Sequence, residues 1–346
     1  METSPLQTVR SASIPSSAPS FPIRDPTNRD LIIPATAEED TKYFVAEQED
    51  DLLRYYREEG YVVVRNLLPA TLCETAMAWF DKEIKPSDAF IYRQTTANPE
   101  RHEFTPHGFM LNPILNIQSL DARRFPKFRE AGLAIITHAK VQAVLRKILG
   151  EDGKLVQSMY FQGNSETWAH QDTYYLDAEE PGRMIAAWFA VEDIAPGAGR
   201  FFIYPKSHLI DMAKNGGDFD VAFNHDRYKQ LVIDVIRHHG LECRAPALRR
   251  GDVLFWSSKV IHGSLETRQP EYSRSSFTAH YIPGSSRFLQ FQSRIRGLNL
   301  ETIAGMRVHK PKDLNRPSRR GAFWVETTFP KSFQTVKRFA IKALTR

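Results

Sequence analysis

The chain has 346 residues, of which 42% are hydrophobic and 25% are charged, a composition typical of a soluble globular protein with a sizeable core. No segment has the roughly 18 to 20 consecutive apolar residues of a transmembrane helix, so we expect no membrane span. The net charge of +5 is too modest to indicate a nucleic-acid partner. Cys73 and Cys243 are too few for a disulfide framework, which favours a reducing, cytoplasmic location.

The two ends of the chain differ in composition from its middle. Residues 1–40 are rich in Ser and Pro and show no apolar periodicity, which predicts a flexible tail. Residues 41–300 contain the periodic segments and are predicted to form the folded domain. Residues 301–346 are strongly basic and are predicted to pack on this domain or on the partner subunit of a homodimer. Recruitment to an anionic partner or surface is the alternative interpretation of this basic extension.

The first half of the folded region has a helical pattern. The segment 46–60 is predicted to be an amphipathic helix that ends at Gly60, and the β-branched run 61–68 that follows predicts a strand. Apolar residues at helical spacing predict a second helix over 69–84. The segment 128–150 also has a helical pattern and closes on a glycine.

From about Leu155 the pattern changes to short β-rich segments separated by Gly, Pro and Asp. Helices followed by many short strands predict an antiparallel sandwich or barrel with helices packed on one side. The predicted strands are 155–162, 167–172, 184–193, 200–205, 252–258, 260–266 and 275–282.

A possible metal-binding pattern lies in the segment Trp168–Asp172. On a strand, residues two apart project to the same face, so His170 and Asp172 can point into one cavity. An imidazole and a carboxylate that converge in this way are two thirds of the facial triad of non-haem iron(II) enzymes. The H-x-D spacing alone is common by chance.

Two later residues make the pattern more specific. His262 lies on a β-rich segment about ninety residues further on, where a second strand can deliver a third ligand. Arg274 follows twelve residues later, and its planar guanidinium matches the distal carboxylate of a keto-diacid. The order H-x-D, then H, then R therefore predicts a metal site with an adjacent anion anchor.

With these motifs, the chain resembles the phytanoyl-CoA dioxygenase-like family of Fe(II)- and 2-oxoglutarate-dependent oxygenases. The resemblance covers roughly residues 46–283 and includes the segments TWAHQD, AAWFAVEDIAPGAGRFFIYPKSHL and GDVLFWSSKVIHGS. It implies a mainly β fold with flanking helices, whose core is a double-stranded β-helix, the cupin-like jelly roll. It also implies dioxygen-dependent oxidation of a small organic molecule in biosynthesis, by hydroxylation, demethylation or desaturation, with release of succinate and CO2.

The resemblance also assigns roles to individual residues. His170, Asp172 and His262 would bind the iron, and Arg274 would bind the C5 carboxylate of 2-oxoglutarate. Four further residues at positions near the co-substrate are Gln157, Gln171, Ser264 and Ser276. Halogenating relatives have Ala or Gly in place of the carboxylate that Asp172 supplies, so hydroxylation or a related oxidation is favoured here.

Other polar residues have simpler interpretations. Tyr174 and Tyr175, just after the H-x-D motif, and Arg93 and His102, in the irregular segment 85–120, are the candidates for substrate contact. His280 is predicted to pack in the core. The histidines of the polar segment around 225–239 are predicted to lie at the surface.

Two other functions fit the same motifs. A non-catalytic metal-binding jelly roll would keep the ligands without turnover. A demethylase acting on a macromolecule would use the basic extension for recruitment, and its affinity for nucleic acid would fall steeply with salt.

Overall fold

The computed structural model describes residues 22–33, 42–214, 224–291, 294–333 and 335–336. Within the predicted N-terminal tail, β1 (Pro22–Arg24) and β2 (Asp30–Ile32) pair as an antiparallel hairpin. The rest of that tail, apart from a few residues beside the hairpin, lies outside the described residues.

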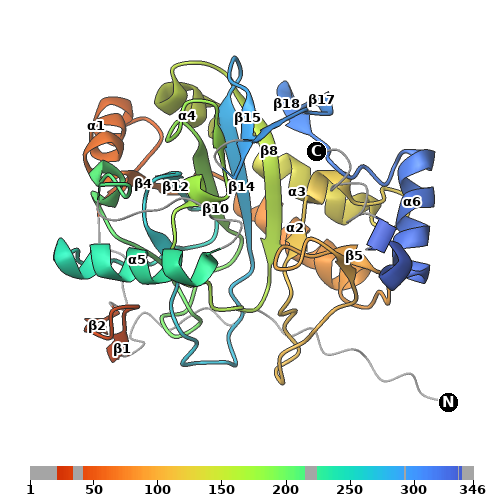
Figure 1. The fold of residues 1–346 in the computed structure, drawn as a ribbon, viewed down its shortest axis with the longest axis horizontal. Helices are drawn as coiled ribbons and strands as arrows, with labels where there is room; N and C mark the ends of the chain where they lie inside the picture. The colour runs from red at the N-terminus through yellow and green to blue at the C-terminus, as the bar shows by residue number, and fades with distance from the viewer. Residues whose placement is uncertain (1–21, 34–41, 215–223, 292–293, 334, 337–346) are drawn as a thin grey trace.

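A large sheet forms the centre of the molecule (Figure 1). Its strands follow the order β17-β18-β8-β14-β10-β12-β4-β3, and β7 also pairs with β8. All neighbouring strands are antiparallel except β3 with β4 and β18 with β8. The strands are β3 (Tyr43–Phe44), β4 (Tyr61–Val64), β7 (Ile114–Leu115), β8 (Gly153–Phe161), β10 (Ile185–Ala190), β12 (Val253–Ser257), β14 (Ser276–Pro283), β17 (Leu300–Ile303) and β18 (Met306–His309).

Shorter strands form three further small sheets. One pairs β11 (Phe201–Ile203) with β13 (His262–Ser264). Another contains β9 (Leu176–Ala178), β15 (Phe288–Gln290) and β16 (Arg294–Arg296), and the third pairs β5 (Ile91–Tyr92) with β6 (Pro99–Glu100). The predicted strand 167–172 is not a regular strand, because only His170 makes a β-bridge there and a 3-10 turn begins at Asp172.

The predicted N-terminal helices are present. They are α1 (Glu49–Glu59), α2 (Ala70–Trp79) with a π-helical turn over Phe80–Ile84, α3 (Pro126–Ile136) and α4 (Ala139–Leu149). The segment 128–150 is thus two helices and not one, because Thr137 leaves the helical conformation and His138 begins the next helix as its N-cap. Later in the chain come α5 (His225–His238) and α6 (Pro317–Thr328).

Side chains alternate between the two faces of the large sheet, as strand geometry requires. On the face toward the helices, Tyr160 and Phe277 pack with Phe128 of α3 in an aromatic cluster. The opposite face carries a row that is in register across β12, β10, β14 and β8 and consists of Trp256, Ala186, His280 and Gln157. The fold is therefore a mixed α/β arrangement with a helix-covered face and a second face that carries polar side chains.

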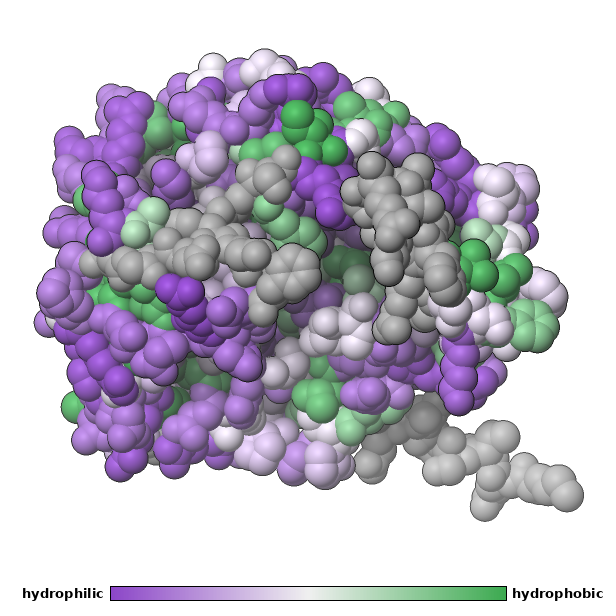
Figure 2. Space-filling model, viewed as in Figure 1, coloured by the Kyte–Doolittle hydropathy of each residue, from purple (hydrophilic) through white to green (hydrophobic). Residues whose placement is uncertain are grey.

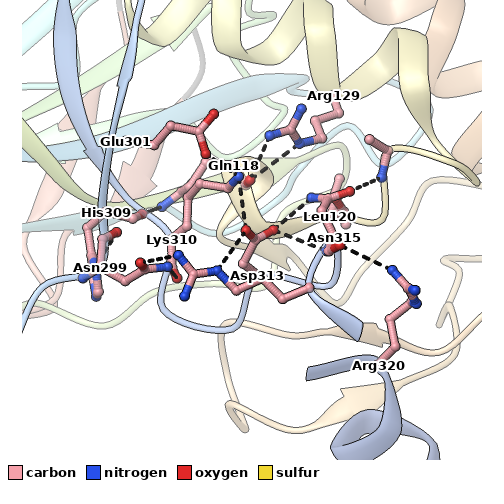
Figure 3. A network of polar contacts seen from close by, with 12 residues as sticks. Gln118, Leu120, Arg129, Asn299, Glu301, His309, Lys310, Asp313, Asn315 and Arg320 are labelled. Carbon is pink, nitrogen blue, oxygen red and sulfur yellow. Dashed lines mark hydrogen bonds and ion pairs between the residues drawn. The ribbon is translucent and has the colours of Figure 1, made fainter. Parts of the chain in front are cut away.

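The C-terminal residues are joined to the segment before α3 by a polar network (Figure 3). Asp313 accepts hydrogen bonds from Asn315 and forms an ion pair with Lys310 at 3.0 Å. Asn315 in turn donates to the carbonyl of Leu120, and Gln118 donates to the carbonyl of His309. This network fixes the chain just before α6 against the body of the protein. Figure 2 shows apolar side chains on the surface at the edge where α6 lies. Trp324 of α6 and Phe329, the residue that follows this helix, are largely exposed.

Gly60 ends α1 and packs closely against the chain just before β13, the strand that contains His262. Its φ of +83° lies in the left-handed region, and a Cβ there would lie 2.4 Å from atoms of His208 and Val260. Gly150 ends α4 with a similar φ of +78°, but no heavy atom lies within 4 Å of its Cβ position.

We therefore expect Gly60→Ala to destabilise the protein more than Gly150→Ala. Both variants bear the left-handed strain of about 1–2 kcal/mol, whereas only Gly60→Ala adds an overpacking cost of about 1–3 kcal/mol. Urea-induced unfolding followed by tryptophan fluorescence measures both free energies. Equal losses in the two variants would contradict the close packing at Gly60.

Candidate metal centre

His170 and His262 are held side by side by their backbones. The amide of His170 donates to the carbonyl of His262 at 3.0 Å, and the amide of His262 donates back at 2.9 Å. Their imidazole centroids lie 4.4 Å apart. Two residues that are 92 positions apart in sequence thus present their side chains together, as the sequence predicts.

Asp172 completes the cluster from the start of the 3-10 turn. Its Oδ1 lies 3.6 Å from Nε2 of His170 and 3.5 Å from Nε2 of His262. One ligand atom from each of the three residues lies within 4.8 Å of the others, and Asp172 and His262 are buried. The donor set of two imidazoles and one carboxylate on one side of a cavity can hold a metal ion and leave other coordination positions open.

Hydrogen bonds orient both imidazoles toward this centre. Nδ1 of His170 lies 2.8 Å from the carbonyl oxygen of Trp168, and Nδ1 of His262 lies 2.9 Å from that of Val260. Because a carbonyl oxygen only accepts, each Nδ1 carries the proton of the neutral ring. Each Nε2 therefore directs a free lone pair at the centre, as a metal-binding histidine requires.

Burial and charge set the protonation states of His262 and Asp172. Burial lowers the pKa of His262 to about 4, although Asp172 opposes this shift, so the imidazole is neutral near pH 7. Burial acts to raise the pKa of Asp172, but the neighbouring histidines, His262 and His280 foremost, outweigh it and hold the pKa well below its ordinary value. The carboxylate is thus ionised.

The second carboxylate oxygen of Asp172 is held by the large sheet. Nε1–H of Trp256 donates to Oδ2 at 2.9 Å, and Nε2 of His280 lies 3.4 Å from the same oxygen. His280 is buried, as predicted, but its contact with the triad was not predicted from the sequence. Its position does carry a signal, because it lies six residues after Arg274 and even spacing on a strand puts both on one face.

Arg274 lies two residues before the start of β14, whereas His280 lies within that strand, and Arg274 lines the same cavity as the triad. Its side chain is buried, with 3% of the residue exposed, and one guanidinium nitrogen donates to the carbonyl of Gly199 at 2.6 Å. Nε has no hydrogen-bond partner, and no carboxylate among the described residues forms an ion pair with this guanidinium. Burial lowers the pKa of Arg274 to about 10, which still leaves the group charged at neutral pH.

The cavity at the triad has a volume of about 560 Å³. Gln157, Ser264 and Tyr175 line it, as expected for residues near co-substrate or substrate. Gln171 points elsewhere, because it alternates with the two ligands around it and donates to the carbonyl of Lys259. Tyr174 is also turned away and stacks on Tyr228, with ring centroids 3.4 Å apart. Neither is among the residues that line this cavity.

Ser276 lies on the face of β14 that Arg274 shares, and it is buried with a hydroxyl that has no hydrogen-bond partner. It is not among the residues that line the cavity.

The predicted substrate contacts of Arg93 and His102 are not supported by their placement. Arg93 is fully buried and donates to the carbonyls of Glu100 and Asn112, while its Nη2 lies 3.1 Å from Nδ1 of His102. His102 in turn bonds the carbonyl of Ile84. Neither side chain lines the cavity at the triad. Their role is to satisfy backbone carbonyls in the irregular segment between α2 and α3.

His225 is a cavity residue that the sequence analysis assigned only to the surface. It begins α5 and is exposed, but its Nε2 lies 2.7 Å from the hydroxyl of Tyr175, and its ring packs edge-on against Trp168. The polar composition around it gives no sign of this contact, because the contact depends on how α5 docks beside the H-x-D segment.

Comparison with solved structures identifies the fold. The chain superposes on the non-haem α-ketoglutarate-dependent carbocyclase SnoK from nogalamycin biosynthesis with a TM-score of 0.54 and 17% identity, covering 72% of this chain and 90% of that one. It superposes on the epimerase SnoN of the same pathway with a TM-score of 0.51 and 16% identity, covering 71% and 87%. The shared fold, the His–Asp–His cluster and a match of residues 56–275 to the phytanoyl-CoA dioxygenase family model together define a non-haem iron, 2-oxoglutarate-dependent oxygenase.

Sequence comparison agrees with the fold. The phytanoyl-CoA dioxygenase family model matches residues 56–275, and the chain belongs to this family. Phytanoyl-CoA dioxygenase domain-containing protein 1 of Bos taurus is 24% identical over 271 residues, covering 66% of this chain and 88% of that protein. The peroxisomal phytanoyl-CoA dioxygenase of Homo sapiens is 20% identical over 269 residues, covering 72% of each. Among the described residues, no helix combines the length and apolar character needed to cross a membrane.

Proposed function

We propose that His170, Asp172 and His262 hold iron(II) and that the protein oxidises a small organic molecule with dioxygen and 2-oxoglutarate. The observation that carries this proposal is the convergence of three ligand atoms within 4.8 Å, with both imidazoles oriented by backbone carbonyls. Two imidazoles and one carboxylate fit iron(II) and leave one side of it open to co-substrate and dioxygen. Trp256 donates a hydrogen bond to the outer oxygen of Asp172, so its other oxygen stays directed at the metal.

Arg274 supplies the anchor for the distal carboxylate of 2-oxoglutarate. A buried guanidinium without a carboxylate partner in the described part of the chain is costly unless an anion joins it. Its unpartnered Nε is free to donate to such an anion. The unpartnered hydroxyl of Ser276, two residues further on the same face, is a candidate second donor.

The chemistry then follows from the cavity. When bound, iron(II) and 2-oxoglutarate supply the oxidising power for attack on a C–H bond, and succinate and CO2 leave as co-products. Around them the protein positions the substrate and limits access of water. Aromatic walls from Trp188, Phe201 and Trp256 surround the triad, while Tyr175 and His225 offer polar groups at the rim. A cavity of about 560 Å³ suits a small molecule.

The class of substrate remains part of the proposal. We place the protein in specialised biosynthesis, where hydroxylation, demethylation and desaturation are the candidate outcomes. SnoK and SnoN, which share its fold, both come from the biosynthesis of nogalamycin. The carboxylate of Asp172, retained in the cluster, favours these oxidations over halogenation.

We also propose a double-stranded β-helix core, a division of the chain at residue 300 and a homodimer. The double-stranded β-helix is supported by the large sheet and by the pair β11–β13, which carries His262 next to Trp256 of the large sheet. The division into residues 41–300 and a packed extension, 301–346, is supported by the network at Asp313. A homodimer would cover the exposed apolar side chains of α6.

A reducing cytoplasmic location is also part of the proposal, because Cys73 and Cys243 are both buried and free.

The test is turnover by the full-length protein. Iron(II) and 2-oxoglutarate added without oxygen should give a visible metal-to-ligand charge-transfer band, and oxygen should then yield succinate. A small-molecule substrate should accelerate succinate release, and oxidised product should form in step with it. A protein that binds iron and 2-oxoglutarate but forms no succinate with oxygen would be a metal-binding module without catalysis, and the proposal would be wrong.

A further inference from the structure

A second cavity lies beside the one at the metal centre. It has a volume of about 620 Å³, and it shares Gln157 and Gln290 with the triad cavity as lining residues. The two cavities therefore meet at these two side chains. The loop after β5 also runs along both, because Gln94 lines the triad cavity and Ala97 lines the second one.

The register of the large sheet shows which side of the metal centre faces the second cavity. Gln157 stands directly opposite His280, whose Nε2 lies 3.4 Å from Asp172. Side chains directly opposite on neighbouring strands project to the same face and touch. Arg274, the proposed co-substrate anchor, precedes β14 and is six residues before His280 in the chain. The second cavity thus meets the triad cavity away from the anchor, where a substrate can arrive without crossing the co-substrate.

The wall of the second cavity is amphipathic. Apolar rings and side chains, including Phe90, Leu115, Phe125 and Phe288, alternate with charged groups. Five of the lining residues are basic (Arg101, Arg123, Arg124, Lys312 and Arg320) and two are acidic (Asp88 and Asp121).

The two acidic residues are already engaged. Asp121 pairs with Arg123 at 2.8 Å, and Asp88 pairs with Arg124 at 3.0 Å. Arg101 and Arg320 take part in none of the ion pairs formed among the described residues: Arg101 lies over the ring of Phe90, and Arg320 donates to the carbonyl of Asn315. Asp121 also interacts electrostatically with Arg320, but its ion pair is with Arg123. An anionic group in this cavity would therefore find two guanidinium groups that have no ion-pair partner among the described residues.

The C-terminal extension provides one side of this cavity. Phe323, Trp324 and Thr327 of α6 and the preceding Lys312 line it. The network at Asp313 and Asn315 fixes the start of α6 against residues 118–129 (Figure 3), so this side is a built part of the molecule. Two basic residues of the extension, Lys312 and Arg320, thus line a cavity that adjoins the metal centre.

We propose that the second cavity binds the remote, anionic end of an elongated amphiphilic substrate, whose apolar part reaches the metal centre past Gln157 and Gln290. The ligand class is an apolar chain or ring system with a carboxylate or phosphate head. This inference rests on the proposed function, since it extends the substrate site of the same oxygenase. It assigns Arg101 and Arg320 to recognition of the head and α6 to the wall of the site.

Dodecanoate and the uncharged dodecanol are the probes for the charge of the site. Titration calorimetry on the full-length protein should show saturable binding of dodecanoate. Dodecanol should bind at least about tenfold more weakly, because it cannot form a charge-assisted hydrogen bond with a guanidinium, and one such bond accounts for about a tenfold change in affinity. The double variant Arg101→Glu, Arg320→Glu should abolish that preference. Arg54→Glu, a change at an exposed arginine of α1, is the matched control and should keep the preference. Equal binding of the two probes to the native protein, or no saturable binding, would overturn the inference.

Fluorinated probes test whether the two cavities form one site. With Mn(II) in place of iron and 2-oxoglutarate present, paramagnetic relaxation should broaden the ¹⁹F signal of 12-fluorododecanoate much more than that of 2-fluorododecanoate. Equal broadening, or stronger broadening near the carboxylate, would overturn the proposed direction of binding. The charge-transfer band of iron(II) and 2-oxoglutarate is measured on the same protein. Absence of this band would contradict the proposed function itself. A normal band without binding of the probes would contradict only this inference.

Discussion

His170→Ala should abolish succinate formation and weaken iron(II) binding by more than about 100-fold. Loss of a residue that only orients a ligand costs about 10- to 100-fold in metal affinity, and loss of the ligand itself should cost more. The remaining pair, Asp172 and His262, would hold the ion from two positions only. Titration of the metal-free protein with iron(II) under anaerobic conditions measures the affinity, and succinate analysis measures the turnover.

The control for this variant is His107→Ala. His107 is exposed and lies outside the residues that line the triad cavity, so its loss should change neither iron affinity nor turnover. Near-ultraviolet circular dichroism of both variants shows whether the aromatic core is intact. Native iron affinity in a folded His170→Ala protein would overturn the assignment of the metal ligands.

Much of this site could be predicted from the sequence because its determinants are local. The spacing of His170 and Asp172 sets their common direction, and the polar residues of β14 alternate with core residues such as Phe277. The same holds for α1, whose apolar positions and closing glycine fixed its bounds to within a few residues.

What the sequence could not show depends on packing between distant segments. Arg93 and His102 were polar residues in an irregular segment, and nothing local shows that buried carbonyls already occupy their donors. His225 reaches Tyr175 only because α5 docks beside the H-x-D segment. The break at Thr137 is also not visible in the sequence, since the residues on both sides have good helical periodicity. In the structure the hydroxyl of Tyr281 donates to the carbonyl of Ile136 beside this break.

The second cavity is a further feature that the sequence alone does not reveal. Its basic residues stand in the sequence as separate groups, in and just after the irregular segment 85–120 and in the C-terminal extension. Only the fold brings Arg101 and Arg320 together in the lining of one cavity. Charge patterning alone therefore could not separate a recognition surface for a macromolecule from the lining of a small-molecule site.

Arg274→Leu should remove the preference of the enzyme for a 2-oxo acid with a distal carboxylate. In the native protein the buried guanidinium can give this carboxylate charge-assisted hydrogen bonds that contribute about 1.5–3 kcal/mol each. A loss of about 3 kcal/mol corresponds to a rise of about 100-fold in the KM for 2-oxoglutarate. Leucine keeps the site apolar and removes both the charge and the donors.

The comparison that isolates the carboxylate uses 2-oxopentanoate, which lacks it. Native protein should use 2-oxoglutarate at least about 100-fold more efficiently than 2-oxopentanoate, and the Arg274→Leu variant should use the two about equally. Arg146→Leu, a change at a surface arginine that pairs with Asp152, should retain the native preference. Since iron binding does not need the guanidinium, iron affinity should stay native in all three proteins. A variant that loses iron or still discriminates between the two acids would show that Arg274 serves the fold and that another group recognises the co-substrate.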